Sequence, residues 1–185
     1  MARAAPGLVV VDEAYYPFSG GASLLGDVPR VANLVLVRTV SKLGLAGLRV
    51  GVAIGAPEWM GELEKLRPPY NVNVLSMCAA RFLLARDEVL EAQTRAIVRS
   101  RAELEAGLDG IAGVERFPSA ANFVLVRVPD GPGAYEALRS RGILVRTFHG
   151  SHALLANCLR LTVGTPDENA RLLEALASIL QPHHA

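Results

Sequence analysis

Three uninterrupted apolar runs near the start of this 185-residue chain constrain its fold more than any other feature. They are GLVVV at 7–11, NLVLVRTV at 33–40 and LRVGVAIG at 48–55. A continuous apolar run, unlike an alternating one, is typical of a parallel strand that is buried on both faces. Such strands need covering helices, but only one short helix is predicted nearby, at 56–67. The sequence therefore predicts part of an α/β domain whose other elements lie outside this region.

The remainder of the chain changes its hydrophobic period twice. Apolar residues at helical spacing predict one long helix, straight or kinked, over about 73–109. Residues 114–180 then follow a β-β-α-β-β-α order, which can close into a small sheet with helices on one face. The sequence TPDE at 165–168 predicts an N-cap, a proline in the first turn and a capping box for the last helix.

These patterns predict three parts. Residues 1–72 are expected to form the part of a large α/β domain that this chain contains. Residues 73–109 are expected to form a connecting helix, and residues 110–185 a small α+β domain.

Composition narrows the classes of partner. The 19 basic and 18 acidic side chains leave a net charge of +1, which argues against nucleic acid or a membrane surface as the main partner. No apolar run reaches the roughly 18 residues of a membrane-spanning helix, and the first residues lack a signal-peptide core. Cys78 and Cys158 show no metal-ligand spacing, so we expect no metal site. We expect a soluble, cytoplasmic protein that binds small molecules.

The segment RTVSKLGLAGLRVG at 38–51 carries the most informative side chain. Lys42 follows a strand-like run in a loop of Gly, Leu and Ala, and Arg49 is the other cation of that loop. Desolvation and a neighbouring cation lower the pKa of a lysine and make its amine nucleophilic. Ser41, the loop N–H groups and Arg49 can hold a phosphate. An amine beside a phosphate site indicates pyridoxal 5′-phosphate, although Lys42 taken alone also suits an ordinary loop lysine.

Pyridoxal phosphate makes a second demand, since its pyridine nitrogen must stay protonated beside a buried carboxylate. Asp12 follows the first apolar run, where α/β sheets place ligand-binding groups. Tyr15, three residues later, can donate a hydrogen bond to the ring 3′-oxygen. Alone, Asp12 also suits a strand-end cap and Tyr15 a core aromatic, but their joint spacing favours the functional interpretation. We expect the neighbouring Glu13 to be structural.

Several motifs in order resemble a known family over nearly the whole chain: DEAY, TVSKLGLAGLRVG, RPPYNVN, SAANFVLVR, GILVR and LRLTVGTPDEN. Together they closely resemble histidinol-phosphate aminotransferase, of the aspartate-aminotransferase fold type. The resemblance implies the C-terminal part of a fold type I large domain, with a mostly parallel sheet, followed by a small α+β domain. It also implies that histidinol phosphate exchanges its amino group with 2-oxoglutarate, in histidine biosynthesis, on a pyridoxal-phosphate-dependent cytoplasmic homodimer.

The resemblance also assigns roles to individual residues. Five residues contact the cofactor: Asp12 at the pyridine nitrogen, Tyr15 at the 3′-oxygen, Lys42 as the covalent attachment and catalytic base, and Ser41 and Arg49 at the phosphate. Two residues hold the anionic end of the substrate, Arg146 of GILVR and Arg160 of LRLTVGT. Taken alone, each of these arginines equally suits a surface position on a strand.

Two alternatives remain open at this stage. One keeps the chemistry but changes the substrate to an aromatic amino acid or another phosphorylated amine. The other is a truncated, catalytically inactive fragment, because the family's chain is longer and its missing half supplies the helix N-terminus at the cofactor phosphate and the aromatic that stacks on the ring.

Overall fold

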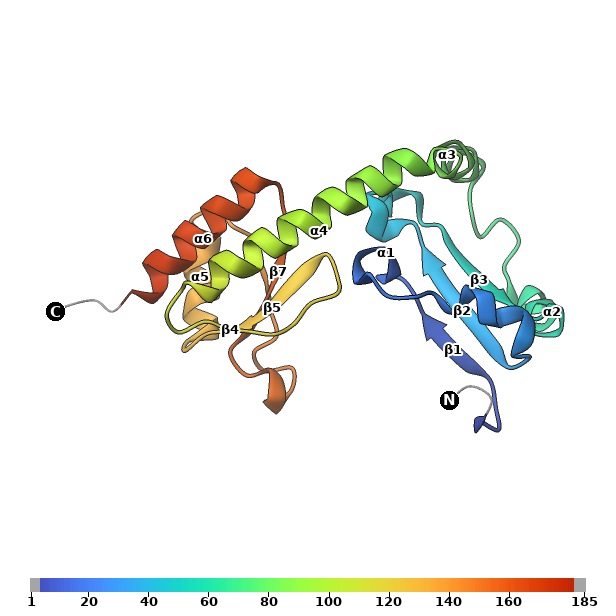
Figure 1. Cartoon of the computed structure of the whole chain (residues 1–185), viewed down its shortest axis with the longest axis horizontal. Coiled ribbons are helices and arrows are strands. Elements are labelled where there is room, and N and C mark those ends of the chain that lie inside the picture. Colours follow the sequence, from blue (N-terminus) through green and yellow to red (C-terminus); the bar gives the residue numbers. More distant parts are fainter. Residues whose placement is uncertain (1–3, 182–185) are drawn as a thin grey trace. The chain divides into compact units, whose positions relative to one another are not determined.

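A computed structural model describes residues 4–181, and the chain divides into two compact units. Unit 1 spans Met1–Thr94 and unit 2 spans Arg95–Ala185 (Figure 1). Among the described residues, no helix combines the length and apolar character needed to cross a membrane. The expected division at 72 and 109 stays a prediction.

Unit 1 is built on a three-stranded sheet in the order β1 (Val9–Asp12), β2 (Leu34–Thr39) and β3 (Gly51–Gly55). β2 and β3 lie within their predicted runs, and β1 extends one residue beyond its run, to Asp12. β1 and β2 are parallel, as predicted, but β2 and β3 are antiparallel, so the prediction of a parallel third strand is wrong. The physical reason is the connection: a loop can join antiparallel strands, whereas parallel strands need a crossover, usually a helix.

Burial also differs from the prediction at the two outer strands of this sheet. The central strand β2 is buried, with Leu34, Val35 and Leu36 each at most 2% exposed. In contrast, Val10 of β1 is 57% exposed and Val52 of β3 is 52% exposed. The expectation that all three strands are buried on both faces is therefore wrong for the chain as described. Each outer strand lacks the neighbouring elements that cover such strands in a complete α/β sheet.

Short helices surround this sheet: α1 (Tyr16–Ser19), the 3₁₀ helices η2 (Leu24–Arg30), η3 (Ser41–Leu43) and η4 (Ala46–Leu48), and α2 (Pro57–Leu66). The long helix expected over 73–109 is two helices, α3 (Val74–Leu84) and α4 (Asp87–Asp109), separated by Ala85 and Arg86. The acidic residues in the first turn of α4 favour a new helix start, because they interact with the positive end of its dipole.

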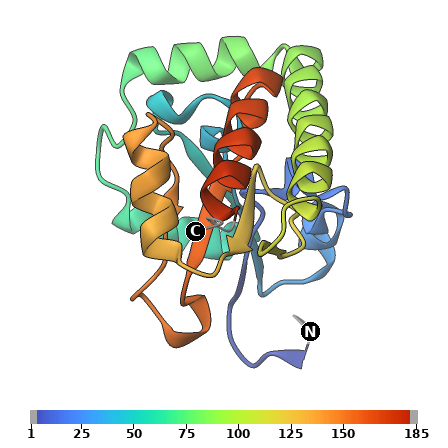
Figure 2. The same cartoon turned by 90° about the vertical axis from the view of Figure 1, so that its left-hand side faces the viewer.

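Unit 2 contains the end of α4 and the elements β4 (Glu115–Arg116), β5 (Phe123–Arg127), α5 (Gly131–Ser140), β6 (Arg146–Thr147), η5 (Ala153–Leu155), β7 (Cys158–Thr162) and α6 (Pro166–Leu180). Its sheet has the order β4-β5-β7-β6 with all pairs antiparallel. Figure 2 shows α6 in red, α5 in orange and the yellow-green part of α4 in front of this sheet. The predicted β-β-α-β-β-α order is confirmed.

The core of unit 2 lies between the sheet and these helices. Its fully buried leucines and valines come from α4, β5, α5, β7 and α6: Leu104, Leu108, Val124, Val126, Leu138, Leu159, Leu161 and Leu176. The predicted capping box of α6 is also confirmed, since the Glu168 N–H donates to Thr165 Oγ1 and the Thr165 N–H donates to Glu168 Oε2. The hydrogen bonds that the Glu168 carboxylate accepts from the Thr165 N–H and the Thr165 hydroxyl hold its pKa below the usual value.

Candidate active site

Lys42 lies in the loop that joins β2 to β3. Thr39, the last residue of β2, closes the base of this loop: its hydroxyl donates to the Val50 carbonyl at 3.2 Å and accepts from the Ser41 N–H at 3.0 Å. Gly44 ends the turn of Lys42 in the left-handed conformation, with φ at 83°. The loop is thereby anchored at both ends, and Lys42 is half-buried within it.

The Lys42 amine lies beside a predicted partner, Tyr15. Its Nζ atom is 5.2 Å from the centroid of the Tyr15 ring. Parallel pairing explains the proximity: the Glu13 N–H donates to the Val37 carbonyl at 2.8 Å, so β1 and β2 end at the same edge of the sheet. The residues that follow the two strands therefore meet there. The structure brings these two predicted site residues together.

Asp12 ends β1 at the same edge, but it is not buried. Its Oδ1 accepts a hydrogen bond from the Ala14 N–H at 2.8 Å, and its side chain is exposed. The expectation of a buried carboxylate at this position is wrong for the described chain. Alternation along the strand explains the exposure, because Asp12 shares a face of β1 with the exposed Val10.

The buried carboxylate of this region belongs to Glu13, which is only 8% exposed. It forms an ion pair with Arg38 at 2.8 Å and accepts hydrogen bonds from the Ser23 hydroxyl at 2.9 Å and the Leu24 N–H at 2.8 Å. Burial alone raises the pKa of Glu13, but the hydrogen bonds from Leu24, Arg38 and Ser23 outweigh it and hold this pKa below 4.5. Glu13 ties the chain after β1 to β2, in agreement with the structural role expected for it.

The two predicted phosphate ligands lie in the same loop as Lys42. Arg49 is exposed and adopts a left-handed backbone with φ at 56°, which is uncommon for a residue other than glycine. Within residues 4–181, neither its guanidinium nor the Ser41 hydroxyl forms a hydrogen bond or ion pair. A free hydroxyl, a free guanidinium and a half-buried amine suit a cofactor that carries a phosphate and an aldehyde.

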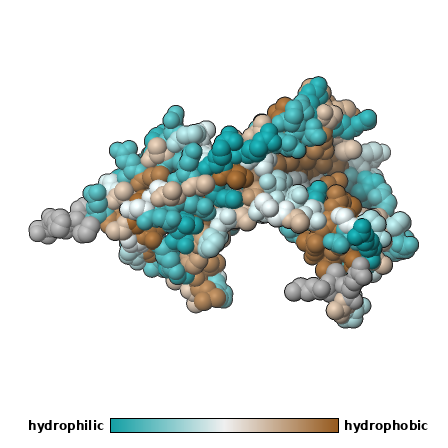
Figure 3. Space-filling model, in the orientation of Figure 1, coloured by the Kyte–Doolittle hydropathy of each residue, from teal (hydrophilic) through white to brown (hydrophobic). Residues whose placement is uncertain are grey.

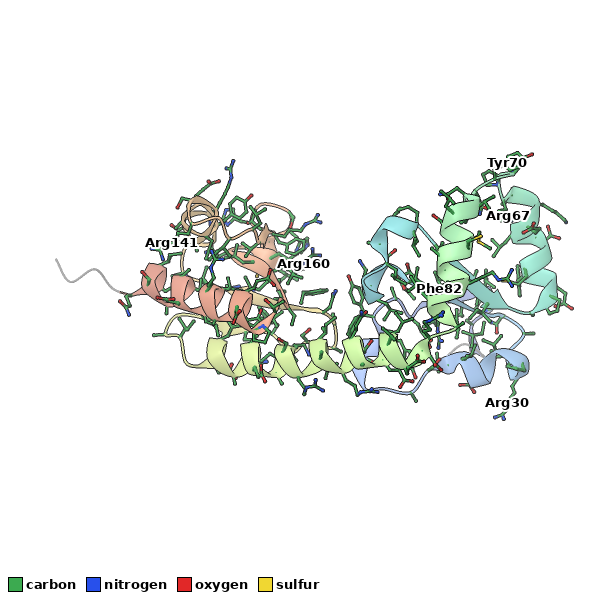
Figure 4. All side chains as sticks on the ribbon, turned by 90° about the horizontal axis from the view of Figure 1, so that it is seen from above. Arg30, Arg67, Tyr70, Phe82, Arg141 and Arg160 are labelled. Atoms are coloured by element: carbon green, nitrogen blue, oxygen red, sulfur yellow. The ribbon has the colours of Figure 1, made fainter. Side chains whose placement is uncertain are left out.

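The two predicted substrate arginines lie in unit 2 and face each other across neighbouring strands. Arg146 of β6 is directly opposite Arg160 of β7 in the antiparallel register. In the described part of the chain neither forms an ion pair, and the Nε atom of Arg160 is buried without a hydrogen-bond partner. Figure 4 shows the side chain of Arg160, labelled, within unit 2. Like charges directly opposite in a sheet are destabilising, so this pair suits a bound anion.

Across residues 4–181 there is no group of three or more His, Cys, Asp or Glu side chains placed to hold a metal ion.

Comparison with known proteins identifies the family. The family described as aminotransferase class I and II matches residues 1–176. The chain belongs to this family. Among curated aminotransferases, the histidinol-phosphate aminotransferase of Chromobacterium violaceum is 53% identical over 174 residues, covering 94% of this chain and 49% of that protein. Histidinol-phosphate aminotransferase 1 of Ralstonia nicotianae is 51% identical and covers 94% of this chain and 46% of that protein.

Solved structures confirm the predicted fold class. A histidinol-phosphate aminotransferase from Sinorhizobium meliloti, in complex with pyridoxal-5′-phosphate, matches with a TM-score of 0.83 at 27% identity, over 94% of this chain and 49% of that one. A decarboxylase from Sulfurospirillum multivorans matches with a TM-score of 0.86 at 26% identity, over 94% of this chain and 53% of that one. The chain thus has the fold of type I pyridoxal-phosphate aminotransferases and spans about half the length of the curated relatives it matches.

Proposed function

We propose that this chain carries the cofactor-binding lysine and the substrate arginines of a pyridoxal-phosphate-dependent aminotransferase. Its proposed substrates are histidinol phosphate and 2-oxoglutarate, in histidine biosynthesis. The observation that carries the proposal is the Lys42 amine at 5.2 Å from the Tyr15 ring centroid, where two parallel strands end. The sequence likeness to histidinol-phosphate aminotransferases supports the choice of substrate.

Within this proposal, each of the five predicted cofactor-binding residues of unit 1 has its own role. When bound, pyridoxal phosphate supplies an aldehyde and an aromatic ring that accepts electrons. Lys42 would hold the cofactor through its amine and, once the substrate amine had displaced it, would move the proton between the substrate Cα and the cofactor's C4′. Tyr15 donates its hydroxyl to the ring oxygen, and Asp12 accepts from the ring nitrogen. Ser41 and Arg49 bind the phosphate through donors that have no other partner among the described residues.

In unit 2, Arg146 and Arg160 hold the anionic end of the substrate. A phosphate carries up to two negative charges and offers several acceptor oxygens, so it can satisfy two guanidinium groups at once. The directly opposed positions of the two arginines, without any acidic partner in residues 4–181, support this role.

We also propose that the working enzyme is a cytoplasmic homodimer, as in the family it resembles. Figure 3 shows brown, apolar surface on its right-hand side, where unit 1 lies. Exposed apolar residues of unit 1 include Val10, Leu66, Tyr70, Leu75 and Phe82, of which Tyr70 is 96% and Leu75 82% exposed. Figure 4 labels Tyr70 and Phe82 in this unit. Surface of this kind marks an interface with further polypeptide.

A second candidate is that the 185-residue chain alone does not catalyse the reaction. The exposed Asp12 favours this candidate, because a solvated carboxylate holds a pyridinium proton less firmly than a buried one. A third candidate, a related aminotransferase with an aromatic or another phosphorylated amine as substrate, shares the same cofactor contacts. Assays with histidinol phosphate and with aromatic amines in parallel distinguish it from the first.

The cofactor proposal has a direct test because the chain contains two lysines, Lys42 and Lys65. The purified chain is mixed with pyridoxal phosphate, its visible absorbance is recorded, and the adduct is reduced with borohydride and mapped by mass spectrometry. We expect labelling at Lys42 that Lys42→Ala removes and Lys65→Ala preserves. Lys65 is exposed and ion-paired with Glu62, so it is a matched control for nonspecific labelling. Equal labelling of both lysines would contradict the proposal.

A further inference from the structure

The guanidinium of Arg160 lies over an aromatic ring. On one side its direct neighbour in the sheet is Leu125 of β5, and Phe123 lies two residues away on that strand. Such diagonal neighbours are within reach of aromatic and long side chains. The Cζ atom of Arg160 is 5.1 Å from the centroid of the Phe123 ring, within the range of a cation–π contact. The ring therefore contacts the guanidinium of a proposed substrate residue.

Phe123 does not belong to the helix-covered core of unit 2. Its neighbours Val124 and Val126 are fully buried in that core, whereas Phe123 is half-buried and points to the other side of β5. The helix-covered core is therefore formed without its ring.

Arg127 of the same strand offers a comparison. It also has an aromatic contact, with Cζ 5.2 Å from the centroid of Phe117. However, Arg127 donates to Glu115 at 2.7 Å and to the carbonyls of Ala156 and Leu154 at 3.3 and 2.9 Å. Its hydrogen-bonding capacity is therefore used within the protein. Arg160, with a similar ring contact, makes no such bonds to residues 4–181, and its Nε is buried.

We propose that Phe123 is a positioning residue for Arg160. An aromatic face attracts a guanidinium without accepting its in-plane N–H groups, whereas a carboxylate would occupy those donors and neutralise the charge. The ring thus fixes Arg160 and leaves its donors directed to an anionic oxygen of the substrate. The inference rests on the proposed function, in which Arg160 holds the anionic end of the substrate.

The test measures binding of inorganic phosphate to the full 185-residue chain, without cofactor or turnover. In ¹⁵N-labelled protein, the Nε–Hε signal of Arg160, assigned with Arg160→Lys, is followed during the titration. We expect this signal to shift and to give a dissociation constant. Phe123→Leu should weaken the affinity about 3- to 10-fold, as expected for the loss of a partly desolvated cation–π contact. Phe123→Tyr, which keeps the ring, should restore it.

Phe117→Leu is the matched control, because it removes the same kind of ring from an arginine whose donors are already used. It should leave phosphate affinity unchanged. Phe123→Met is a second variant without a ring, whose flexible side chain can fill the space differently in case the leucine variant does not fold, and it should weaken affinity to the same extent. Thermal melts of each variant separate a loss of folding from a loss of binding.

Three results would overturn the inference: an unshifted Arg160 signal at high phosphate, wild-type affinity in folded Phe123→Leu or Phe123→Met, or an equal loss in Phe117→Leu. A purely structural role for Phe123 predicts lower melting temperatures with unchanged phosphate affinity. The phosphate titration is independent of the labelling of Lys42, so failure of the cofactor proposal and failure of this inference are distinguishable.

Discussion

Removal of the Glu13 carboxylate should destabilise unit 1 by an amount that follows from its contacts. Glu13→Ala leaves the part-buried Leu24 N–H without its acceptor, which costs about 1–3 kcal/mol. It also removes the partner of Arg38, whose side chain is 29% exposed and is therefore partly rehydrated. That second loss is nearer ~1 kcal/mol than the larger cost of a fully buried ion pair. We expect the free energy of unfolding to fall by about 3 kcal/mol in total.

The assay is urea unfolding followed by tryptophan fluorescence. Trp59 is the single tryptophan, and its indole donates to the Ala32 carbonyl at 2.9 Å within unit 1, so it reports on this unit. The pH dependence has a definite sign. Because folding lowers the pKa of Glu13 below 4.5, its contribution is complete above pH 4.5 and is lost as the pH falls through the folded-state pKa. Glu13→Gln should lack this component of the acid sensitivity.

The control is Glu58→Ala, which removes an exposed carboxylate from the same unit and should change stability by no more than about 0.5 kcal/mol. Equal stabilities of Glu13→Ala and Glu58→Ala would refute the role given to Glu13. An unchanged acid sensitivity in Glu13→Gln would refute its lowered pKa.

Thr165→Ala should lower the stability of unit 2 by about 1 kcal/mol, measured by thermal melting, because it removes the N-cap of α6. Leu138→Ala, at a side chain with 0% exposure, should cost about 2–5 kcal/mol in the same experiment. Gly131→Ala should cost about 2 kcal/mol, since the added Cβ would lie 2.6 Å from the Asn157 Cα. Gly61→Ala meets no atom within 4 Å inside α2 and should instead stabilise unit 1 by about 0.5–1 kcal/mol. Destabilisation by Gly61→Ala, or a neutral Gly131→Ala, would contradict these placements.

Features coded by neighbouring residues were predictable from the sequence. The capping box at Thr165 and Glu168 depends on contacts within one turn, and the structure contains it. The strand positions follow from apolar runs, which reflect burial of the nearest side chains. The proximity of Lys42 and Tyr15 followed from a family resemblance and from the rule that parallel strands end at one edge.

Features that depend on distant residues were not predictable in the same way. The antiparallel direction of β3 depends on which strand it pairs with, and its apolar run is identical in kind to that of a parallel strand. The exposure of Asp12 depends on the elements packed against β1, which the sequence around Asp12 does not describe. Phe123 had no separate signal either, because its contact with Arg160 arises from register between β5 and β7.

The basic side chains of this chain are nearly all arginines, and this preference affects how the chain reacts with aldehydes. Of its 19 basic side chains, two are lysines, and Lys65 is held in an ion pair on the exposed side of α2. Guanidinium groups stay protonated and do not condense with an aldehyde under ordinary conditions. Arginine thus supplies nearly all of the positive charge without adding competing nucleophiles. The chain is intrinsically chemoselective: a reactive carbonyl compound meets very few side-chain amines, and the partly shielded one lies in the loop between β2 and β3.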